Sequence, residues 1–255
     1  MEEYTLITGA TEGIGYELAK LFAKEKNNLI LVARNLENLK EVKKKLEVNN
    51  IKIKLQALDL SNINQCEELI KYTKENNIIV NKLINNAGVG NFEFFKDGNW
   101  ENYEKLIDLN MKAVTKLTNY YLKEMINNNE GGVLNIASTA AFSAGPKMAI
   151  YYASKAYVLN LTEAIHEEVK DSNIKISCLC PGPVKTEFQN KAGIKKSESA
   201  KKYLMDARDV AKIGYKEFEK GKVIIIPGIK NKMLVVLNKF IPRKVSRSII
   251  YKINK

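Results

Sequence analysis

The sequence has few of the residues that build metal sites and disulfide frameworks. Its 255 residues include one histidine, three cysteines and five prolines. Cys66, Cys178 and Cys180 are not spaced as a set of metal ligands, and the last two alternate along an apparent buried strand. We therefore expect reduced, packed thiols, and we predict neither a disulfide nor a bound metal.

Long apolar runs are also missing. No segment reaches the roughly 18 consecutive apolar residues that would predict a membrane-spanning helix. The amino-terminal stretch MEEYTLITGA begins with acidic residues and enters a strand-like run at once, so we predict no secretory signal and expect a cytoplasmic protein. An apolar content of 45% and a charged content of 27% are typical of a globular protein.

Acidic residues are too few to balance the basic ones, and the formal net charge is +12. A nucleic-acid partner, an anionic membrane or substrate, or simply a lysine-rich surface would each be compatible with this charge. Lysines interleave with glutamates in segments such as residues 36–50, which favours solvated helix faces. No basic stripe carries interleaved aromatic residues, so we predict no nucleic-acid partner.

Apolar runs of strand length recur along the chain. They occupy residues 4–8, 28–33, 53–58, 81–86, 132–138, 174–180 and 222–228. The runs are continuous, as expected for parallel strands covered on both faces. Intervening segments, such as residues 13–27 and 61–77, have apolar residues at helical spacing, and Ser61 is the expected N-cap of the second. This alternation predicts an α/β fold with one doubly wound parallel sheet of seven strands and helices on both faces.

The chain has no linker-like segment, repeat or low-complexity region, so we predict a single domain. Residues 1–227 form its main part, and residues 228–255 form a basic amphipathic extension with eight Lys or Arg and no acidic residue. Helical spacing in the extension predicts two short helices separated at Pro242. Three placements stay open for it: over a cleft, against a partner subunit, or on an anionic membrane surface.

A glycine-rich turn follows the first predicted strand. Gly9, Gly13 and Gly15 stand between that strand and the first predicted helix. Glycines let the backbone turn tightly and approach a pyrophosphate, and the following helix N-terminus offers N–H groups to it. The position of this turn in an alternating α/β chain predicts a dinucleotide-binding site.

The stretch AIYYASKAY, residues 149–157, contains three tyrosines and one lysine. A phenol has an ordinary pKa of about 10, and a nearby cation would lower that pKa. In a helix, Lys155 lies on the same face as Tyr151, whereas Tyr152 and Tyr157 point elsewhere. The spacing therefore identifies Tyr151 as the candidate reactive phenol.

Several motifs occur in a particular order: TGATEGIG at 8–15, LDL at 58–60, NNAG at 85–88, LN at 109–110, IAS at 136–138, YYASK at 151–155 and PGPVKT at 181–186. In order and spacing they resemble the short-chain dehydrogenase/reductase family over nearly the whole chain. The resemblance implies a Rossmann-type domain, a small-molecule carbonyl substrate and a homo-oligomer of two or four subunits. TEGIG and the basic extension are similar to the NADP-preferring branch that includes long-chain ketoacyl and hydroxysteroid reductases, which implies an apolar or acyl substrate.

The resemblance also implies the site residues. Four would be catalytic: Asn110, Ser138, Tyr151 and Lys155. The cofactor would contact the last two and Asn110, together with Gly9, Thr11, Gly13, Ile14, Gly15, Arg34, Asp59, Leu60, Asn86, Ala87, Gly88, Pro181, Gly182, Val184 and Thr186. A substrate lid would span about residues 187–207, with Phe188 and Tyr203.

In the family's mechanism, Ser138 and Tyr151 hydrogen-bond the carbonyl oxygen and Tyr151 donates a proton. Lys155 binds the nicotinamide ribose and lowers the pKa of Tyr151, and Asn110 bends its helix and holds a water linked to the lysine. This pattern predicts a reductase that converts a ketone or aldehyde to an alcohol.

The end of the second strand bears on the choice of cofactor. Ala33 and Arg34 stand there, and the family's NADP pattern has no acid but a guanidinium that can meet a 2′-phosphate. Glu12 departs from that pattern, because some NADP-preferring members carry a basic residue in its place. We predict an NADPH-dependent enzyme, and two alternatives stay open: an NAD(H)-linked alcohol dehydrogenase and a non-catalytic nucleotide-binding protein.

Overall fold

A parallel seven-stranded sheet forms the centre of the molecule in the computed structural model, which describes residues 2–47, 50–194 and 204–254. The strand order is β3-β2-β1-β4-β5-β6-β9. The strands are β1 (Glu2–Thr8), β2 (Asn28–Ala33), β3 (Ile53–Ala57), β4 (Ile78–Asn85), β5 (Gly131–Ile136), β6 (Ile174–Leu179) and β9 (Ile224–Ile225). All seven predicted strands are present, although only two residues of the last one pair in the sheet.

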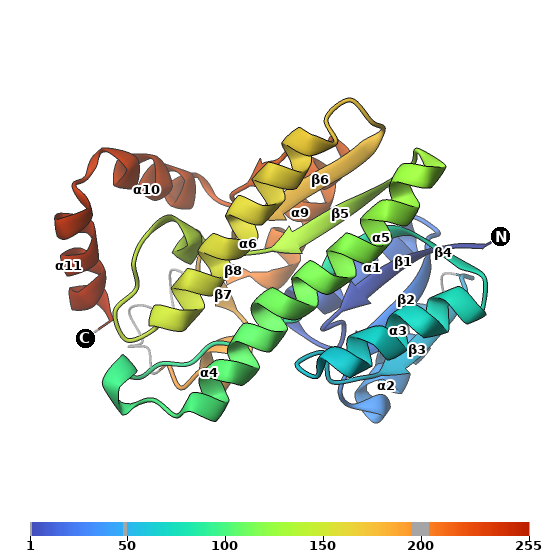
Figure 1. Cartoon of the computed structure of the whole chain (residues 1–255), viewed down its shortest axis with the longest axis horizontal. Coiled ribbons are helices and arrows are strands. Elements are labelled where there is room, and N and C mark those ends of the chain that lie inside the picture. The colour runs from blue at the N-terminus through green and yellow to red at the C-terminus, as the bar shows by residue number, and fades with distance from the viewer. Residues whose placement is uncertain (1, 48–49, 195–203, 255) are drawn as a thin grey trace.

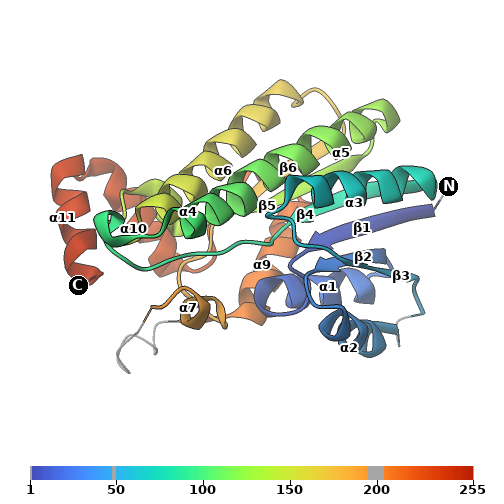
Figure 2. The ribbon, with the colours of Figure 1, turned by 60° about the horizontal axis from the view of Figure 1, so that its bottom comes forward.

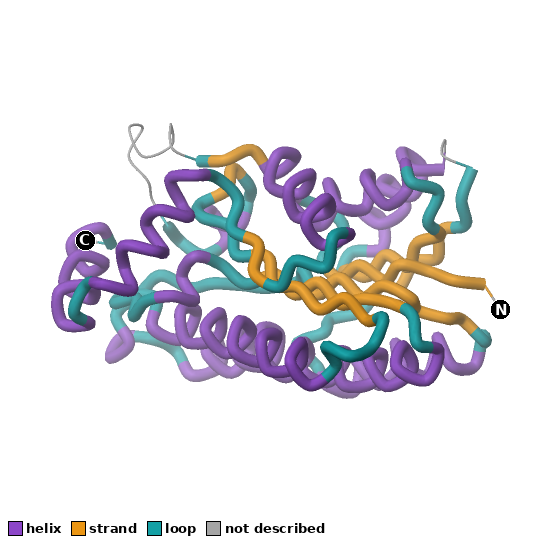
Figure 3. The backbone as a smooth tube through the Cα atoms, turned by 90° about the horizontal axis from the view of Figure 1, so that it is seen from above, coloured by secondary structure: helices purple, strands orange, loops and turns teal. Residues whose placement is uncertain are grey.

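Helices cover both faces of the sheet (Figures 1 and 3), as the sequence predicts. One face carries α1 (Gly13–Lys24), α2 (Leu36–Leu46) and α9 (Ala207–Glu219). The other carries α3 (Ile63–Glu75), α5 (Val114–Asn128) and α6 (Ala149–Glu168), with α4 (Trp100–Ile107) leading into α5. The predicted doubly wound Rossmann-type fold is therefore confirmed.

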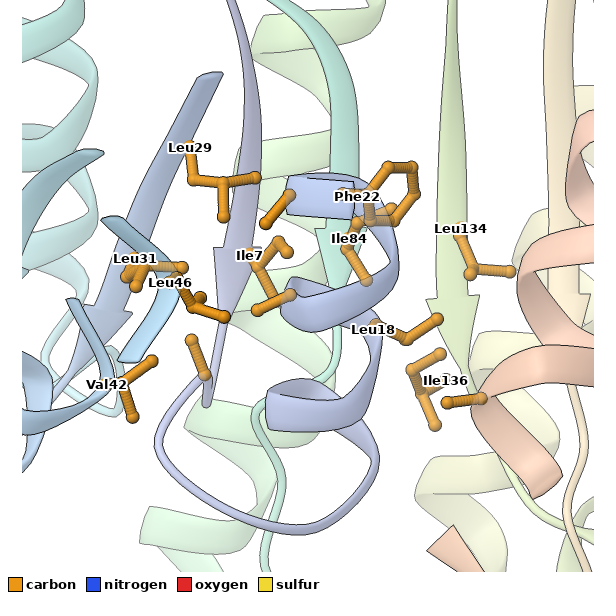
Figure 4. Close-up of a cluster of buried hydrophobic side chains, with 14 of the residues drawn as sticks. Ile7, Leu18, Phe22, Leu29, Leu31, Val42, Leu46, Ile84, Leu134 and Ile136 are labelled. Atoms are coloured by element: carbon orange, nitrogen blue, oxygen red, sulfur yellow. The ribbon is translucent and has the colours of Figure 1, made fainter. Parts of the chain in front are cut away.

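Successive strand residues enter different cores. Ile7 packs with Leu18 and Phe22 of α1 (Figure 4), whereas the neighbouring Leu6 packs on the opposite face with Tyr121 of α5. Side chains alternate across a strand, so a sheet covered on both faces requires apolar residues at every position. This explains why the strands appear as continuous apolar runs.

The N-terminus of α3 differs from the prediction. Its N-cap is Asn62, whose side-chain oxygen accepts a hydrogen bond from the N–H of Asn64 at 3.0 Å. The hydroxyl of Ser61 instead donates to the carboxylate of Asp59 at 2.7 Å. Because the carboxylate at the end of β3 is a strong acceptor, Ser61 is not the cap and the helix begins one residue later than expected.

The C-terminal extension forms the two predicted helices, α10 (Ile229–Phe240) and α11 (Arg243–Ile253), with Pro242 between them. Hydrogen bonds attach both helices to the main part of the molecule: the side-chain amide of Asn238 donates to the carbonyl of Phe142 at 2.6 Å, and that of Asn254 donates to the carbonyl of Pro146 at 2.9 Å. Figure 2 shows them at the end of the molecule opposite the N-terminus.

Short elements complete the fold. They are η2 (Phe95–Asp97), η4 (Thr139–Phe142), α7 (Phe188–Lys191) and a two-stranded sheet of β7 (Val184–Lys185) and β8 (Met205–Asp206). The predicted lid at 187–207 falls here, and its middle part with Tyr203 lies outside the described residues. The three cysteines are buried and free, as predicted. Among the helices of the described chain, none has both the length and the apolar character needed to span a bilayer.

Candidate active site

A cavity of about 1070 Å³ lies along the carboxyl ends of the strands. Most of the predicted site residues line it: Gly9, Thr11, Gly13, Ile14, Arg34, Asp59, Leu60, Asn86, Ala87, Gly88, Ser138, Tyr151, Lys155, Pro181, Gly182, Val184 and Thr186. Gly15 and Asn110 do not line it. The topology thus brings residues from positions 9 to 186 of the chain to one cavity.

The glycine turn after β1 forms one end of this cavity. Gly9 has a φ of +64°, and a Cβ there would lie 2.9 Å from the Cα of Ala87. A Cβ on Gly15 would lie 2.3 Å from both the side-chain nitrogen of Asn86 and the carbonyl oxygen of Gly9. That amide of Asn86 donates to the carbonyls of Thr8 and Gly9, each at 3.0 Å, and so holds the turn. Gly15 therefore leaves room for Asn86 and for the carbonyl of Gly9 on the side of the turn away from the cavity.

The start of α1 fits the phosphates of a dinucleotide. Its N-cap residue Glu12 makes no side-chain capping bond and instead forms an ion pair with Lys191 of α7. The first N–H groups of a helix have no partner within the helix, so those of α1 are available to an anion in the cavity. Pyrophosphate at this position would also interact favourably with the positive end of the helix dipole.

The opposite side of the turn holds polar groups suited to an adenosine. Arg34, Asn35 and Asp59 line the cavity there. Burial acts to raise the pKa of Asp59, but hydrogen bonds from Ser61 and the charge of Arg34 outweigh it, and the pKa lies below its ordinary value. Asp59 is therefore an anionic hydrogen-bond acceptor, and Arg34 is a cation beside it.

Tyr151 and Lys155 share one face of α6, as the four-residue spacing predicts. The Nζ of Lys155 lies 5.8 Å from the centre of the Tyr151 ring and donates to the carbonyl of Ile136 at 2.9 Å. Tyr152 forms a hydrogen bond with Asn254. Tyr157 lies on a different face, where its hydroxyl is 2.8 Å from that of Thr115.

Burial dominates the ionisation of both groups. It raises the pKa of Tyr151 to about 12, against the opposing effect of a hydrogen bond with Ser138. It lowers the pKa of Lys155 to about 8. Desolvation of the phenolate and of the ammonium thus sets both directions in this structure, and the lowering of the Tyr151 pKa by Lys155 together with a bound nicotinamide stays a prediction.

Ser138 follows β5 and begins η4, where its Oγ accepts from the N–H of Ala140 at 3.1 Å and donates to the carbonyl of Pro181 at 3.3 Å. These contacts fix the hydroxyl beside Tyr151. The ring of Phe188 from α7 lies 5.4 Å from that of Tyr151, centre to centre, and closes the site above the phenol. Ser138 and Tyr151, which are thirteen residues apart in the sequence, are thus in direct contact.

Asn110 supports the site from behind. It lies in a π-helical turn, η3 (Asp108–Ala113), which widens the helix between α4 and α5. Its side chain accepts from the N–H of Val89 at 3.0 Å, and donates to the carbonyl of Val89 at 2.9 Å and to Ser154 at 3.2 Å. A Cβ on Gly88 would lie 3.3 Å from the oxygen of Asn110 and 3.4 Å from the Nζ of Lys155, so the three groups converge.

Residues 3–197 match the family described as short chain dehydrogenase. The protein belongs to this family. It is 31% identical over 195 residues to the 3-oxoacyl-acyl-carrier-protein reductase FabG of Rickettsia prowazekii, covering 76% of this chain and 78% of the relative. It is 28% identical over 236 residues to the 7beta-hydroxysteroid dehydrogenase of Mediterraneibacter gnavus, covering 91% and 89%.

A solved structure of the family is similar in fold. The short-chain dehydrogenase from Sphingobium yanoikuyae, in complex with NADPH, superimposes with a TM-score of 0.83 at 28% identity, covering 90% of this chain and 89% of that one. The family therefore accounts for the motif order along the chain and for the sheet order.

This short-chain dehydrogenase has further cavity residues that the sequence did not reveal. Asn231 and Leu234 of α10, and Ile253 and Asn254 at the end of α11, line the cavity that contains Tyr151. The extension is therefore part of the cavity wall. Of the three placements left open, the one over a cleft is the one that this contact supports. No local pattern marks these residues, because they reach the site only through the packing of α10 and α11.

Proposed function

We propose that the protein is an NADPH-dependent carbonyl reductase that converts a ketone or aldehyde with an apolar or acyl chain to the alcohol. The observation that carries this proposal is the convergence of Ser138, Tyr151 and Lys155 in a cavity whose far end is the glycine turn and the start of α1. The relatives are named for reduction of an oxoacyl group and dehydrogenation of a hydroxysteroid, which agrees with this reaction class.

The glycine turn, the start of α1 and Lys155 would hold the cofactor. NADPH supplies a hydride when it is bound. The hydroxyls of Ser138 and Tyr151 would hold the carbonyl oxygen and orient the carbonyl carbon. Positioning of this kind removes much of the entropic barrier to reaction.

Tyr151 would supply the proton. Its O–H bond breaks as a new O–H bond forms on the carbonyl oxygen, and the phenolate that remains lies beside the Lys155 ammonium. A pKa of about 12 keeps the phenol protonated at neutral pH, as a proton donor requires. Lys155, with a pKa of about 8, is still largely protonated at pH 7 and can stabilise the phenolate. A positioned proton donor contributes on the order of 10²–10⁴ in rate.

Arg34 supports the preference for NADPH over NADH. It lines the cavity directly after Ala33, where an acidic side chain would repel a 2′-phosphate. A guanidinium at this place can form paired hydrogen bonds with a phosphate. The NAD(H)-linked alcohol dehydrogenase is the second candidate, and Arg34 is the residue that argues against it.

The cavity wall supports an apolar substrate. Apolar side chains line the part around Tyr151: Phe92, Met148, Phe188, Ile194 and Leu234. Apolar walls with a few convergent polar groups are typical of small-molecule sites, and here the polar groups are the hydroxyls of Ser138 and Tyr151.

Cofactor titration tests the proposal. NADPH and NADH are titrated separately into the protein, and nicotinamide fluorescence is followed. We expect NADPH to bind at least about tenfold more tightly, since a phosphate–guanidinium contact contributes about 1.5–3 kcal/mol. The Arg34→Asp variant should reverse the preference. Tighter NADH binding by the natural protein would support the second candidate, and binding of neither nucleotide would refute both enzymes.

A panel of ketones with increasing alkyl length tests the substrate class in the presence of NADPH. Turnover that increases with chain length supports an apolar or acyl substrate, and a preference for short polar ketones contradicts it.

We also propose, from the family resemblance and the three packed thiols, a cytoplasmic homo-oligomer of two or four subunits. Sedimentation velocity measures the subunit number.

A further inference from the structure

Helix α10 presents its apolar residues to the outside of the molecule. The face that packs inward carries Asn231, Val235 and Asn238, two of them polar. The opposite face carries large apolar side chains, four of which recur at helical spacing and are at least half exposed: Ile229, Met233, Leu237 and Phe240. A helix on the surface of a globular protein normally has the reverse arrangement. The exposed fractions of 77% for Ile229 and 82% for Phe240 show that the described chain leaves this face uncovered.

The same end of the molecule exposes further apolar groups. Helix α11 adds Val245 and Ile249, one helical turn apart. The aromatic turn, which runs from η2 to the first residue of α4, lies at this end too (Figure 1) and exposes Phe95 and Trp100. A short series of contacts joins it to the tail: Asn254 bonds to the carbonyl of Pro146, and the Nζ of the next residue, Lys147, lies 5.0 Å from the centre of the Phe94 ring.

The two helices of the extension carry charge of one sign, whereas the aromatic turn carries both signs, with Lys96 beside Asp97. Residues 228–255 include eight Lys or Arg and no Asp or Glu. Lys232 and Lys239 lie on α10 between its inward face and its apolar outward face, and Arg247 and Lys252 are exposed on α11. A second copy of the chain, docked face to face by two-fold symmetry, would bring these like charges together. The surface therefore favours an anionic partner that also accepts aliphatic side chains.

We propose that the outward faces of α10 and α11, with the aromatic turn at Phe95 and Trp100, bind the surface of an anionic lipid bilayer. A helix with apolar residues on one face and flanking lysines lies in the interface, with its apolar face among the acyl chains and its ammonium groups at the headgroups. Tryptophan is also favoured at this depth. Leu234 and Ile253 are exposed and line the cavity, so the bound membrane would lie at the rim of the candidate active site.

Vesicle flotation tests this surface with the full chain. Vesicles of phosphatidylcholine alone are compared with vesicles of equal phosphatidylcholine and phosphatidylglycerol. We expect binding to the anionic vesicles at least about tenfold tighter than to the neutral ones, because each basic residue near the surface adds roughly fivefold to the affinity. The double variant Leu237→Glu/Phe240→Glu should reduce the binding at least about tenfold, because it places two acids in the apolar face.

The control variant is Ile63→Glu/Ile126→Glu, which makes the same change of charge at two exposed isoleucines outside this surface. It should bind anionic vesicles as the natural protein does. The proposal would be overturned if the protein bound neither vesicle, or if the two variants lost vesicle binding equally. It would also be overturned if vesicle binding were absent and the Leu237→Glu/Phe240→Glu variant converted a dimer to a monomer. That last result would identify the surface as an interface between copies of the chain. Circular dichroism of both variants checks that they fold.

Discussion

At the scale of the residue, the candidate site contains two buried groups, Tyr151 and Lys155, and burial disfavours the charged form of each. Tyr151 is a weaker acid than a free phenol and Lys155 a weaker base than a free lysine, and burial is the main cause for both. Burying an ammonium costs folding free energy unless partners compensate, and in the described part of the chain the ammonium of Lys155 donates to the carbonyl of Ile136. The geometry that suits proton transfer is therefore not the geometry of greatest stability.

Substituting the phenol alone tests its role. The Tyr151→Phe variant keeps the ring against Phe188 but removes the proton donor. We expect kcat to decrease by about 10²–10⁴ while the affinity for NADPH changes by less than about threefold. Steady-state kinetics and fluorescence titration measure the two quantities.

The matched control is Tyr157→Phe, which removes a hydroxyl from the same helix on a face directed to Thr115. Its kcat should remain within about threefold of the natural value. Equal activity losses in the two variants would mean that hydroxyls of α6 act through stability and that Tyr151 is not the donor.

The lysine makes folding dependent on pH. Its pKa is about 8 in the folded protein against 10.5 when unfolded, so between these values the unfolded chain binds more protons. The free energy of unfolding therefore rises with pH between about 8 and 10.5. Below pH 8 the buried ammonium lowers this free energy by its full amount. The Lys155→Met variant should unfold at pH 7 with a free energy higher by about 1–3 kcal/mol, although it is inactive, and the advantage should shrink towards pH 10.

Urea unfolding at several pH values measures this effect. Lys123→Met, at an exposed position of α5, controls for the loss of one positive charge. A Lys155→Met variant that is less stable than the natural protein at pH 7 would show that the carbonyl contact of the ammonium outweighs its burial.

At the scale of the element, the π-helical turn between α4 and α5 is the unusual feature. Insertions of this kind are frequent at functional sites. Here the turn places Asn110 where one side chain bonds to both backbone groups of Val89, next to Gly88 and Lys155. The asparagine is thus a positioning residue for the loop after β4.

Removing this asparagine should disturb both the loop and the reaction. The Asn110→Ala variant removes the side-chain partners of the partly buried N–H and carbonyl of Val89, and an unpaired group costs up to about 1–3 kcal/mol when it is buried. We expect a free energy of unfolding lower by roughly 2–4 kcal/mol and a weaker affinity for NADPH. Urea unfolding and fluorescence titration measure the two, with Asn119→Ala at an exposed position of α5 as the control. An unchanged NADPH affinity would mean that the loop keeps its position without the asparagine.

At the scale of the whole molecule, the sheet and the extension enclose one cavity. Buried clusters lie on both faces of the sheet and share β1, β2, β4 and β5. Helices α10 and α11 join this body through Phe142 and Pro146, in the segment between β5 and α6. We therefore predict that the chain folds as one cooperative unit.

Thermal unfolding checks this prediction. Far-ultraviolet circular dichroism reports on all helices, and the fluorescence of Trp100, the single tryptophan, reports on α4. Their transitions should coincide. NADPH at about 100 times its Kd should raise the Tm by roughly 5–10 °C, because ligand linkage adds about 2.7 kcal/mol. Two separate transitions would contradict a single unit.

Local periodicity and local spacing in the sequence predict part of the fold and of the candidate site. The seven apolar runs predict the strands, because a sheet covered on both faces makes every strand position apolar. The step of four residues from Tyr151 to Lys155 predicts their shared helix face, because a helix has 3.6 residues per turn. The order of the motifs identified the family.

Features that depend on distant parts of the chain could be recognised only in the folded molecule. The direction of the Tyr151 pKa depends on burial by residues of α4, η4 and α7 together, and no single neighbour in the sequence carries that information. The cap of α3 moved to Asn62 because Asp59 competes for Ser61. Finally, the sequence showed that α10 is amphipathic, but its apolar face points outward because the opposite face is held to the main body, where Asn238 bonds to the carbonyl of Phe142 and Asn231 packs against Gly182.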